Sequence, residues 1–166
     1  MGNQLGGEAD AELASSTSVR ILMFHVDSFT CTVTQKGRSP IVETPSSPST
    51  HIENGLLVLA SAELGDEDDA DQVARGTARE IDKLAGQVKA SEIMLLPFAH
   101  LFAEPAPAQA ALDLLEAVAA ELRDAGFGVQ RPPFGWFHTW DLQAKGHPLS
   151  RVARRVRPTP LADQQP

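Results

Sequence analysis

The stretch VRILMFHVDSFTCTVTQ, residues 19–35, decides how the fold begins. Its first part, residues 19–25, is a continuous apolar run, which is typical of a strand covered on both faces. Its last part, residues 29–35, alternates apolar side chains with three threonines, the period of two expected of a strand with one buried face. Because Val-Asp-Ser lies between the two parts, we expect a tight turn there and a hairpin of two strands.

The segments after this hairpin show strand and helix patterns in alternation. The helix expected at about residues 70–89 has apolar residues three or four apart, and the second helix, at about 107–125, ends at Gly126, a favoured helix stop. Further strands are expected at 56–63, 92–98, 127–130 and 136–143. The order β-β-β-α-β-α-β-β predicts an α/β (α+β) fold, a compact two-layer mixed sheet with two helices on one side.

The chain is predicted to hold one domain, at residues 18–156, because 166 residues suffice for one sizeable core. Residues 1–17 are small, polar and without periodicity, and residues 157–166 are rich in proline and polar side chains. We expect a disordered N-terminal tail and a flexible C-terminal tail. The connection at residues 36–55 is rich in proline and serine, which fits either a functional lid or a disordered excursion.

Cysteine usage and hydropathy indicate a cytoplasmic protein. Cys31 is the only cysteine, so no internal disulfide can form, and the N-terminus lacks a basic region followed by an apolar run. No apolar run approaches the roughly 20 residues that span a bilayer. We therefore expect neither secretion nor a membrane partner.

Positive charge is concentrated at the C-terminal end of an acidic chain. Residues 1–130 hold 8 basic and 20 acidic side chains, whereas residues 131–166 hold 6 basic and 2 acidic ones. This distribution fits a patch that contacts nucleic-acid phosphates, or equally a solvated basic tail. The candidate phosphate contacts are Arg154, Arg155 and Arg157.

Two segments place useful polar groups at strand ends. PFAH, residues 97–100, delivers His100 onto a loop, and the strand near residue 136 places His138 between Trp136 and Trp140. A histidine in that setting is either aromatic filling or a group that moves a proton or orients a water, with indoles as stacking surfaces for a base. The sequence alone leaves both interpretations open.

Other kinds of site lack their sequence signatures. The histidines and the single cysteine do not have zinc-ligand spacing, and the acidic run at residues 66–71 lacks the EF-hand pattern, so it fits a helix cap better than a calcium loop. A glycine-rich phosphate loop and a GxSxG elbow are also missing. We expect no metal and no cofactor.

Several short motifs together resemble one known family, the archaeal-type editing domain of threonyl-tRNA synthetase. PFAHL at 97–101, GFGVQRPPFG at 126–135 and KGHPLSR at 145–151 match its PFAHL, GF-V--APFGYY and KGHPLAE in order and at nearly the same separations. The resemblance runs over about residues 19–156 and implies a fold similar to that of D-aminoacyl-tRNA deacylases. It also implies hydrolysis of the ester that joins a wrong amino acid to tRNA.

The resemblance implies roles for individual residues. His100 and His138 take the catalytic positions, although the family has a lysine where His138 stands. At Arg151 the family has a glutamate that helps to orient that site, and at Phe137 it has a tyrosine. The residues implied to contact substrate are His25, Asp27, Phe98, Ala99, Phe137, Lys145, His147 and Arg151.

The function expected on this basis is that of a freestanding aminoacyl-tRNA deacylase acting as a trans-editing proofreading factor. The expected substrate is seryl-tRNA(Thr), although a D-aminoacyl substrate stays open. The alternative is a non-catalytic module that binds the tRNA 3′ end and joins a synthetase, because both the catalytic lysine and the glutamate are replaced. Expected partners are the tRNA(Thr) 3′ end carrying a wrong amino acid, a second copy in a homodimer, and a threonyl-tRNA synthetase without its own editing domain.

Overall fold

One long strand, β1 (Val19–Lys36), is the backbone of the sheet in this computed structural model, which describes residues 19–99 and 105–157. On one side β1 pairs antiparallel with β2 (Ser49–Ser61) over most of its length. On the other side its first half pairs with β6 (Arg151–Val156) and its second half with β5 (Trp136–Ala144). Strands β5 and β6 therefore follow each other along one edge of β1, with residues 145–150 between them.

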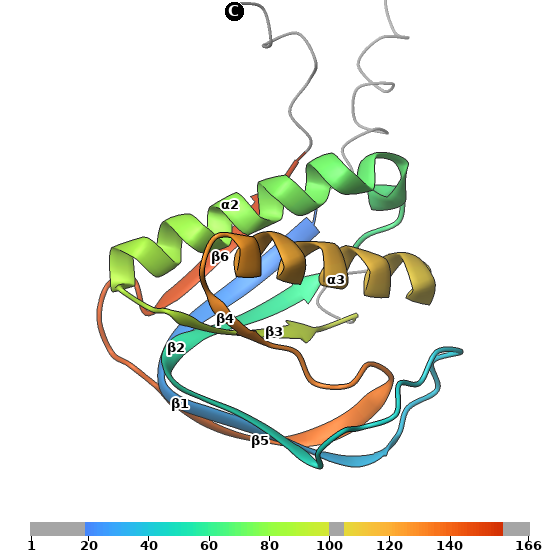
Figure 1. Cartoon of the computed structure of the whole chain (residues 1–166), viewed down its shortest axis with the longest axis horizontal. Helices are drawn as coiled ribbons and strands as arrows, with labels where there is room; N and C mark the ends of the chain where they lie inside the picture. The colour runs from blue at the N-terminus through green and yellow to red at the C-terminus, as the bar shows by residue number, and fades with distance from the viewer. Residues whose placement is uncertain (1–18, 100–104, 158–166) are drawn as a thin grey trace, which may run out of the picture.

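The sheet is extended beyond β2 by two parallel strands. β3 (Glu92–Pro97) pairs with β2, and β4 (Gly128–Gln130) pairs with β3. The order is β4-β3-β2-β1-β5, with β6 also on β1, which makes a six-stranded mixed sheet. The short helix η1 (Asp66–Asp69) leads into α2 (Ala70–Val88), and α3 (Ala108–Asp124) links β3 to β4. Figure 1 shows both long helices over one face of the strongly curved sheet. The predicted two-layer α+β fold is confirmed.

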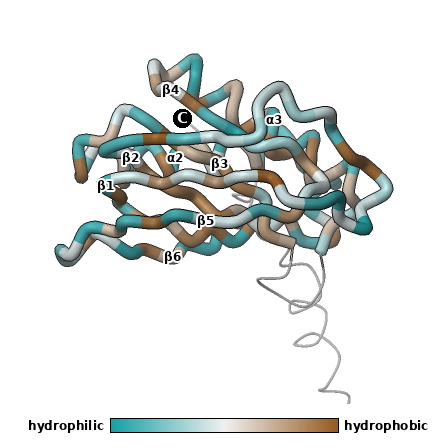
Figure 2. Tube along the Cα trace, turned by 90° about the horizontal axis from the view of Figure 1, so that it is seen from below, coloured by the Kyte–Doolittle hydropathy of each residue, from teal (hydrophilic) through white to brown (hydrophobic). Residues whose placement is uncertain are grey.

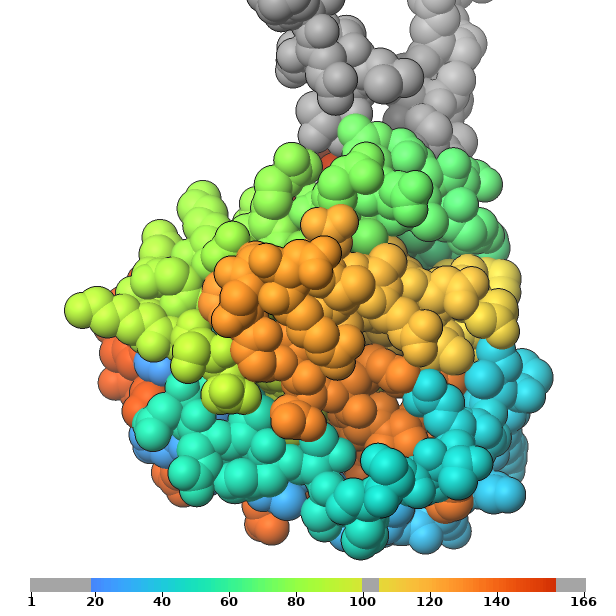
Figure 3. All heavy atoms as spheres, viewed as in Figure 1, coloured from blue at the N-terminus to red at the C-terminus, as the bar shows by residue number. Residues whose placement is uncertain are grey.

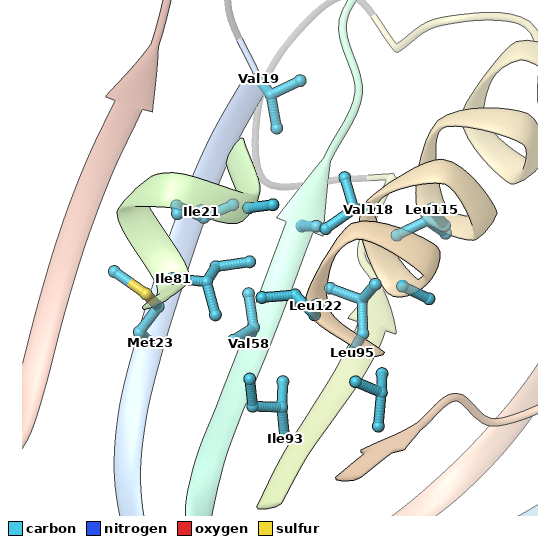
Figure 4. Close-up of a cluster of buried hydrophobic side chains, with 14 of the residues drawn as sticks. Val19, Ile21, Met23, Val58, Ile81, Ile93, Leu95, Leu115, Val118 and Leu122 are labelled. Atoms are coloured by element: carbon cyan, nitrogen blue, oxygen red, sulfur yellow. The ribbon is translucent and has the colours of Figure 1, made fainter. Parts of the chain in front are cut away.

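Most of the core lies between the helices and the sheet. Ile81 of α2 and Leu122 of α3 are fully buried against Ile93 of β3 (Figure 4). A second buried cluster, which contains no helical residue, covers the opposite face around Phe29, Leu57 and Met94. Burying a side chain of this size contributes about 1.5–3 kcal/mol. The two clusters explain why residues 93–96 of β3 are all apolar and buried.

The packed face of β1 changes by one residue at Asp27. Before it, Phe24 and Val26 face the second cluster, and after it Phe29 and Cys31 do so. The register with β5 shifts at the same place, between Val26 and Ser28. Such an irregularity increases the local bend and twist of a strand. The mixture of hydrophobic and hydrophilic residues along β1 and β5 can be followed in Figure 2.

The neighbouring strand bends with β1. Asn54, opposite Asp27, has a positive φ of 47°. A Cβ added to Gly55 would stand 2.7 Å from the carbonyl oxygen of Glu92, so only glycine lets β2 and β3 approach this closely. These residues allow the end of the sheet that carries β5 to curve away from the helices (Figure 1).

The predicted hairpin at residues 19–35 is wrong. Val-Asp-Ser is part of a continuous strand, since it lacks the Asn-Gly or Asp-Gly pair that a two-residue hairpin turn favours. The partner of residues 28–32 is instead the first part of β2, which begins at Ser49 within the segment predicted to be a connection. The true connection is residues 37–48.

A strand was also missed at the C-terminal end. β6 contains three arginines, but Val152 and Val156 are buried between them. The high positive charge of residues 151–156 suggested a solvated tail or patch, and this concealed the buried pair. Arg157 is exposed, and the remainder of the predicted C-terminal tail and all of residues 1–17 lie outside the described residues.

Candidate functional site

A cleft of about 930 Å³ opens between the first turns of α3 and the curled end of the sheet. Its walls include residues 36–40 at and after the end of β1, residues 97–99 at and after the end of β3, and residues 133–138 before and at the start of β5. Four of the predicted site residues line it: Phe98, Ala99, Phe137 and His138. His100 lies outside the described residues.

One carboxylate fixes the wall of this cleft. Glu43 receives two hydrogen bonds of 2.8 Å from the Arg131 guanidinium and one of 2.6 Å from the backbone N–H of Phe134. The Trp136 indole N–H donates to the Glu43 carbonyl oxygen at 2.8 Å. The Arg131 guanidinium beside Glu43 holds the pKa of that carboxyl below its usual range. The 37–48 connection is thus fastened to residues 131–136, and Figure 3 shows these two segments, in cyan and orange, in contact.

Two glycines permit the close contact between these segments. The Gly37 N–H donates to the Gly135 carbonyl oxygen at 2.7 Å. Gly135 has a φ of 89°, and a Cβ there would collide with the carbonyl oxygen of Ile41. A side chain at Gly135 would therefore push the two segments apart.

His138 is half-buried on β5, opposite Val33 of β1. Burial lowers the pKa of its imidazole, so the ring is neutral at pH 7. The Trp140 indole N–H donates to His138 Nδ1 at 3.2 Å. An indole nitrogen only donates, so this bond places the proton of the neutral ring on Nε2. His138 then offers Nε2–H as a hydrogen-bond donor.

An aromatic row connects His138 to the loop after β3. The rings of His138 and Trp140 are stacked, with centroids 6.5 Å apart, and Trp140 lies 6.2 Å from Phe98. Trp140 also meets the buried Phe29 edge-on at 5.7 Å. The row orients His138 and brings it to the same region as Ala99, the last described residue before the loop.

A second group of predicted residues lies at the junction between β5 and β6. The ring nitrogens His25 Nδ1 and His147 Nε2 are 2.8 Å apart, so one ring donates and the other accepts. Lys145 forms an ion pair with Asp27. The His25 backbone also receives the Lys145 N–H and donates to the Ser150 carbonyl oxygen. Residues 145–150 are thereby held against the bend in β1.

This junction group is separate from the cleft within one chain. Arg151 pairs with Phe24, whereas His138 pairs with Val33, nine residues further along β1. That is roughly 30 Å of strand at the usual rise per residue. The substrate-contact residues expected on the family pattern are therefore brought together in two groups, and the roles expected of His25, Asp27, Lys145, His147 and Arg151 stay predictions.

The arginines proposed for phosphate contact lie on or after β6. Arg154 is near Glu80 of α2, with a nitrogen-to-oxygen distance of 3.7 Å, and Arg155 and Arg157 are exposed. Among the residues that the structure describes, no group of three or more His, Cys, Asp or Glu side chains could hold a metal ion. In the same part of the chain, no helix is long and apolar enough to cross a membrane.

Sequence reasoning missed the residues that build the cleft wall. Glu43 lies in a segment whose proline and serine content indicates only a connection, and Arg131 belongs to the basic C-terminal end, whose charge suggests phosphate contact or a solvated tail. Lys36 and Arg38, which line the cleft, were not singled out. The sequence gives little sign of the Glu43–Arg131 pair, because the two residues are 88 positions apart.

The fold matches that of solved structures. A solved structure described as a probable eukaryotic D-amino acid tRNA deacylase matches with a TM-score of 0.57 at 11% identity, covering 84% of this chain and 100% of that one. The structure of a c-Myc DNA unwinding element binding protein matches with the same TM-score at 12% identity, over 81% of this chain and 97% of its own. At these identities the similarity establishes a fold of the D-aminoacyl-tRNA deacylase type.

The sequence comparison identifies the family. Residues 19–156 match the family described as the archaea-specific editing domain of threonyl-tRNA synthetase, and the chain belongs to that family. The threonine–tRNA ligase of Methanopyrus kandleri is 34% identical over 140 residues, and that of Thermococcus onnurineus 36% over 142 residues. These matches cover 84% and 85% of this chain, but only 22% and 23% of the two ligases. The resemblance seen in the motifs is confirmed.

Replacing Glu43 tests the cleft wall. We expect Glu43→Gln to lower the free energy of unfolding at pH 7 by about 1–3 kcal/mol, because Arg131 loses a charged hydrogen-bond acceptor. The pKa of Glu43 is depressed in the folded state, so its contribution is present above the usual value near 4.5 and is lost as the pH falls through the folded pKa. Denaturant unfolding at pH 7 and pH 3 measures both effects. An equal loss from the exposed Glu121→Gln would contradict this specific role.

The His25–His147 contact predicts a second pH dependence. Burial, followed by the nearby His147 and Lys145, lowers the pKa of His25 below its reference of 6.5. The unfolded chain then binds the proton more readily, so stability is complete above pH 6.5 and falls as the pH drops from there toward the folded pKa. We expect His147→Ala to reduce this fall, measured by denaturant unfolding at pH 7.5 and pH 5. An unchanged pH dependence would show that burial alone sets it.

Proposed function

We propose that this chain hydrolyses the ester bond of mischarged tRNA, with seryl-tRNA(Thr) as its substrate. The observation that carries the proposal is the neutral His138 in the cleft, at the position where the family pattern has a catalytic lysine. The family match that supports the proposal covers residues 19–156. We propose that it acts in the cytoplasm as a trans-editing factor.

Serine is the substrate that creates a need for such an activity. A binding site for threonine rejects serine poorly, since the two differ by one methyl group, which is worth roughly 1–3 kcal/mol. A second site that hydrolyses the wrong ester supplies the missing discrimination. A cleft of about 930 Å³ has room for an aminoacylated adenosine.

The Trp140 hydrogen bond indicates what His138 does. With Nδ1 occupied by the indole N–H, Nε2–H is left to donate to the ester carbonyl or to an attacking water. A lysine ammonium is also only a donor, so the imidazole keeps this part of the lysine's role while losing its charge. A positioned donor stabilises the negative charge that develops on the carbonyl oxygen during attack by water.

The alternative function is binding of the tRNA 3′ end without hydrolysis. It is supported by two replacements: His138 stands where the family has a catalytic lysine, and Arg151 stands where it has a glutamate. A protein of this kind would hold the aminoacylated end and associate with a synthetase that lacks an editing domain.

Deacylation of seryl-tRNA(Thr) tests the proposal. We expect serine release well above the uncatalysed rate, and a loss of about 10²-fold in His138→Ala, the scale of a positioned catalytic group. The rate should rise with pH through the lowered pKa of His138, because protonation of Nδ1 breaks the bond from Trp140. Thr139→Ala, the exposed neighbour on the same strand, is the matched control and should keep the rate.

The outcomes separate the two functions. Full hydrolysis by His138→Ala would make the ring a packing residue only. Tight binding of seryl-tRNA with no serine release would support the non-hydrolytic alternative. In that case His138→Lys combined with Arg151→Glu should create cleavage if those two replacements removed it.

We also propose that two copies associate through β5. This strand ends the sheet order, and its outer edge has no partner strand within the described part of the chain. Nine residues long, it contains no proline, lysine or arginine, the residues that usually protect an edge. Trp140 and Leu142 are 37% and 40% exposed on it. Pairing of the same strand from two copies covers these groups with two-fold symmetry.

Light scattering tests this association. We expect the mass of a dimer at micromolar concentration, and the mass of a monomer for Leu142→Lys, which places a charge at the proposed interface. Leu64→Lys is the control, because Leu64 is 55% exposed near η1, away from β5. A monomer mass for the unaltered chain overturns the proposal.

A further inference from the structure

We propose that Lys36 and Arg38 bind the phosphodiester backbone of the tRNA strand whose 3′ end enters the cleft. This inference rests on the proposed deacylase function, because it concerns the same cleft. It replaces the C-terminal arginines as the main phosphate contacts.

The described lining of the cleft is positively charged. The chain has 22 acidic and 14 basic residues, yet none of the described residues that line the cleft is acidic. Lys36 and Arg38 are the lysine and arginine among them. A cleft in an acidic protein whose described lining presents two cations and no carboxylate attracts a negatively charged ligand.

These two cations stand on a fixed frame. Lys36 pairs with Trp136 at the end of the β1–β5 ladder, and its ammonium lies 6.0 Å from the centre of the Trp136 ring. Between the two cations, the Gly37 N–H is bound to Gly135. The hydrogen bonds that Glu43 makes with Arg131, Phe134 and Trp136 hold the rest of the segment. The backbone that carries these cations is already ordered, so ligand binding does not have to order it.

Arg38 is available for a ligand. Its side chain is exposed, and among the described residues it has no hydrogen bond or ion pair. The carboxylate of Glu43, in the same 37–48 connection, is already bound to Arg131. An arginine fork without a protein partner at a cleft is suited to a phosphate, which it can bind through two parallel N–H donors.

An exposed aromatic ring lies beside the segment that carries the two cations. Phe137 is 56% exposed, and its ring is 3.8 Å from where a Cβ at Gly37 would stand. Single-stranded nucleic acids are bound by a positive groove along the backbone together with aromatic rings on which bases stack. Lys36, Arg38 and Phe137 supply these two elements beside His138, and this favours the unpaired end of a tRNA over a duplex.

The C-terminal arginines are poorly placed to contact the same stretch of tRNA. Arg154 pairs with Ile21, fifteen residues before Lys36 on β1, which is roughly 50 Å of strand length. Arg154 also has Glu80 of α2 as a neighbour. A tRNA 3′ end bound at His138 would therefore lie closer to Lys36 and Arg38 than to Arg154.

The test compares two double variants in the full chain. Lys36→Ala/Arg38→Ala removes the proposed contacts, and Arg154→Ala/Arg155→Ala removes the same net charge from β6. Thermal unfolding checks that both stay folded. Binding of an acceptor-stem minihelix that ends in single-stranded CCA is measured from about 50 to 200 mM salt. Deacylation is measured on seryl-tRNA(Thr) and on seryl-adenosine, which lacks phosphates.

We expect the Lys36/Arg38 variant to bind the minihelix roughly tenfold more weakly and to lower the salt slope by about 1.4, which is about 0.7 for each single-strand phosphate contact. Its KM for seryl-tRNA should rise with little change in kcat, and its activity on seryl-adenosine should be kept. The Arg154/Arg155 variant should match the unaltered chain. Equal losses from both variants, or a loss only from Arg154/Arg155, overturn the inference.

The two proposals can fail separately. If the unaltered chain binds the minihelix through Lys36 and Arg38 but cleaves neither ester, the phosphate site holds and the deacylase proposal fails. If it cleaves both esters and the Lys36/Arg38 variant keeps its KM and salt slope, the deacylase proposal holds and the phosphate site is wrong. Failure to bind the minihelix at the lowest salt overturns the phosphate site.

Discussion

The pairing of β1 with two successive strands is the constraint on which the rest of the structure depends. Because β6 occupies the first half of one edge and β5 the second half, the chain must cross from one to the other at the His25 backbone. This crossing fixes the register of β5 on β1. The register in turn places His138 opposite Val33 and Trp136 opposite Lys36, so backbone hydrogen bonds position these cleft residues.

The bend at Asp27 gives this arrangement its shape. It lets one half of the sheet pack under the helices while the other half, with β5, forms a wall at some distance from them (Figure 1). The space between would be open on one side without residues 37–48. The Glu43–Arg131 pair closes that side. The Glu43 carboxylate accepts hydrogen bonds from the Phe134 backbone N–H as well as from the Arg131 guanidinium, and a partly buried carboxylate needs such partners.

Local patterns predicted the helices and most strands well, because those elements depend on the periodicity of nearby residues. The helix predicted at 70–89 is observed at Ala70–Val88, and that at 107–125 at Ala108–Asp124. The hairpin failed because Asp27 looks like a turn residue locally, whereas its ion pair is with Lys145, 118 residues away. The family motifs correctly indicated that Phe98, Ala99, Phe137 and His138 share one site, and all four line the cleft. A motif gives no distances, so it could not show that Arg151 lies apart from them within one chain.

The position of β5 at the sheet edge has a consequence for local stability. β1 has neighbours on both sides, but β5 is hydrogen-bonded only to β1 within the described part of the chain. An edge strand opens at a lower free energy than the centre of a sheet, so amide hydrogens along β5 should exchange with solvent before those of β1 and β3. The strand that carries His138 is therefore among the parts of the sheet that a bound ligand or a second copy can rigidify most.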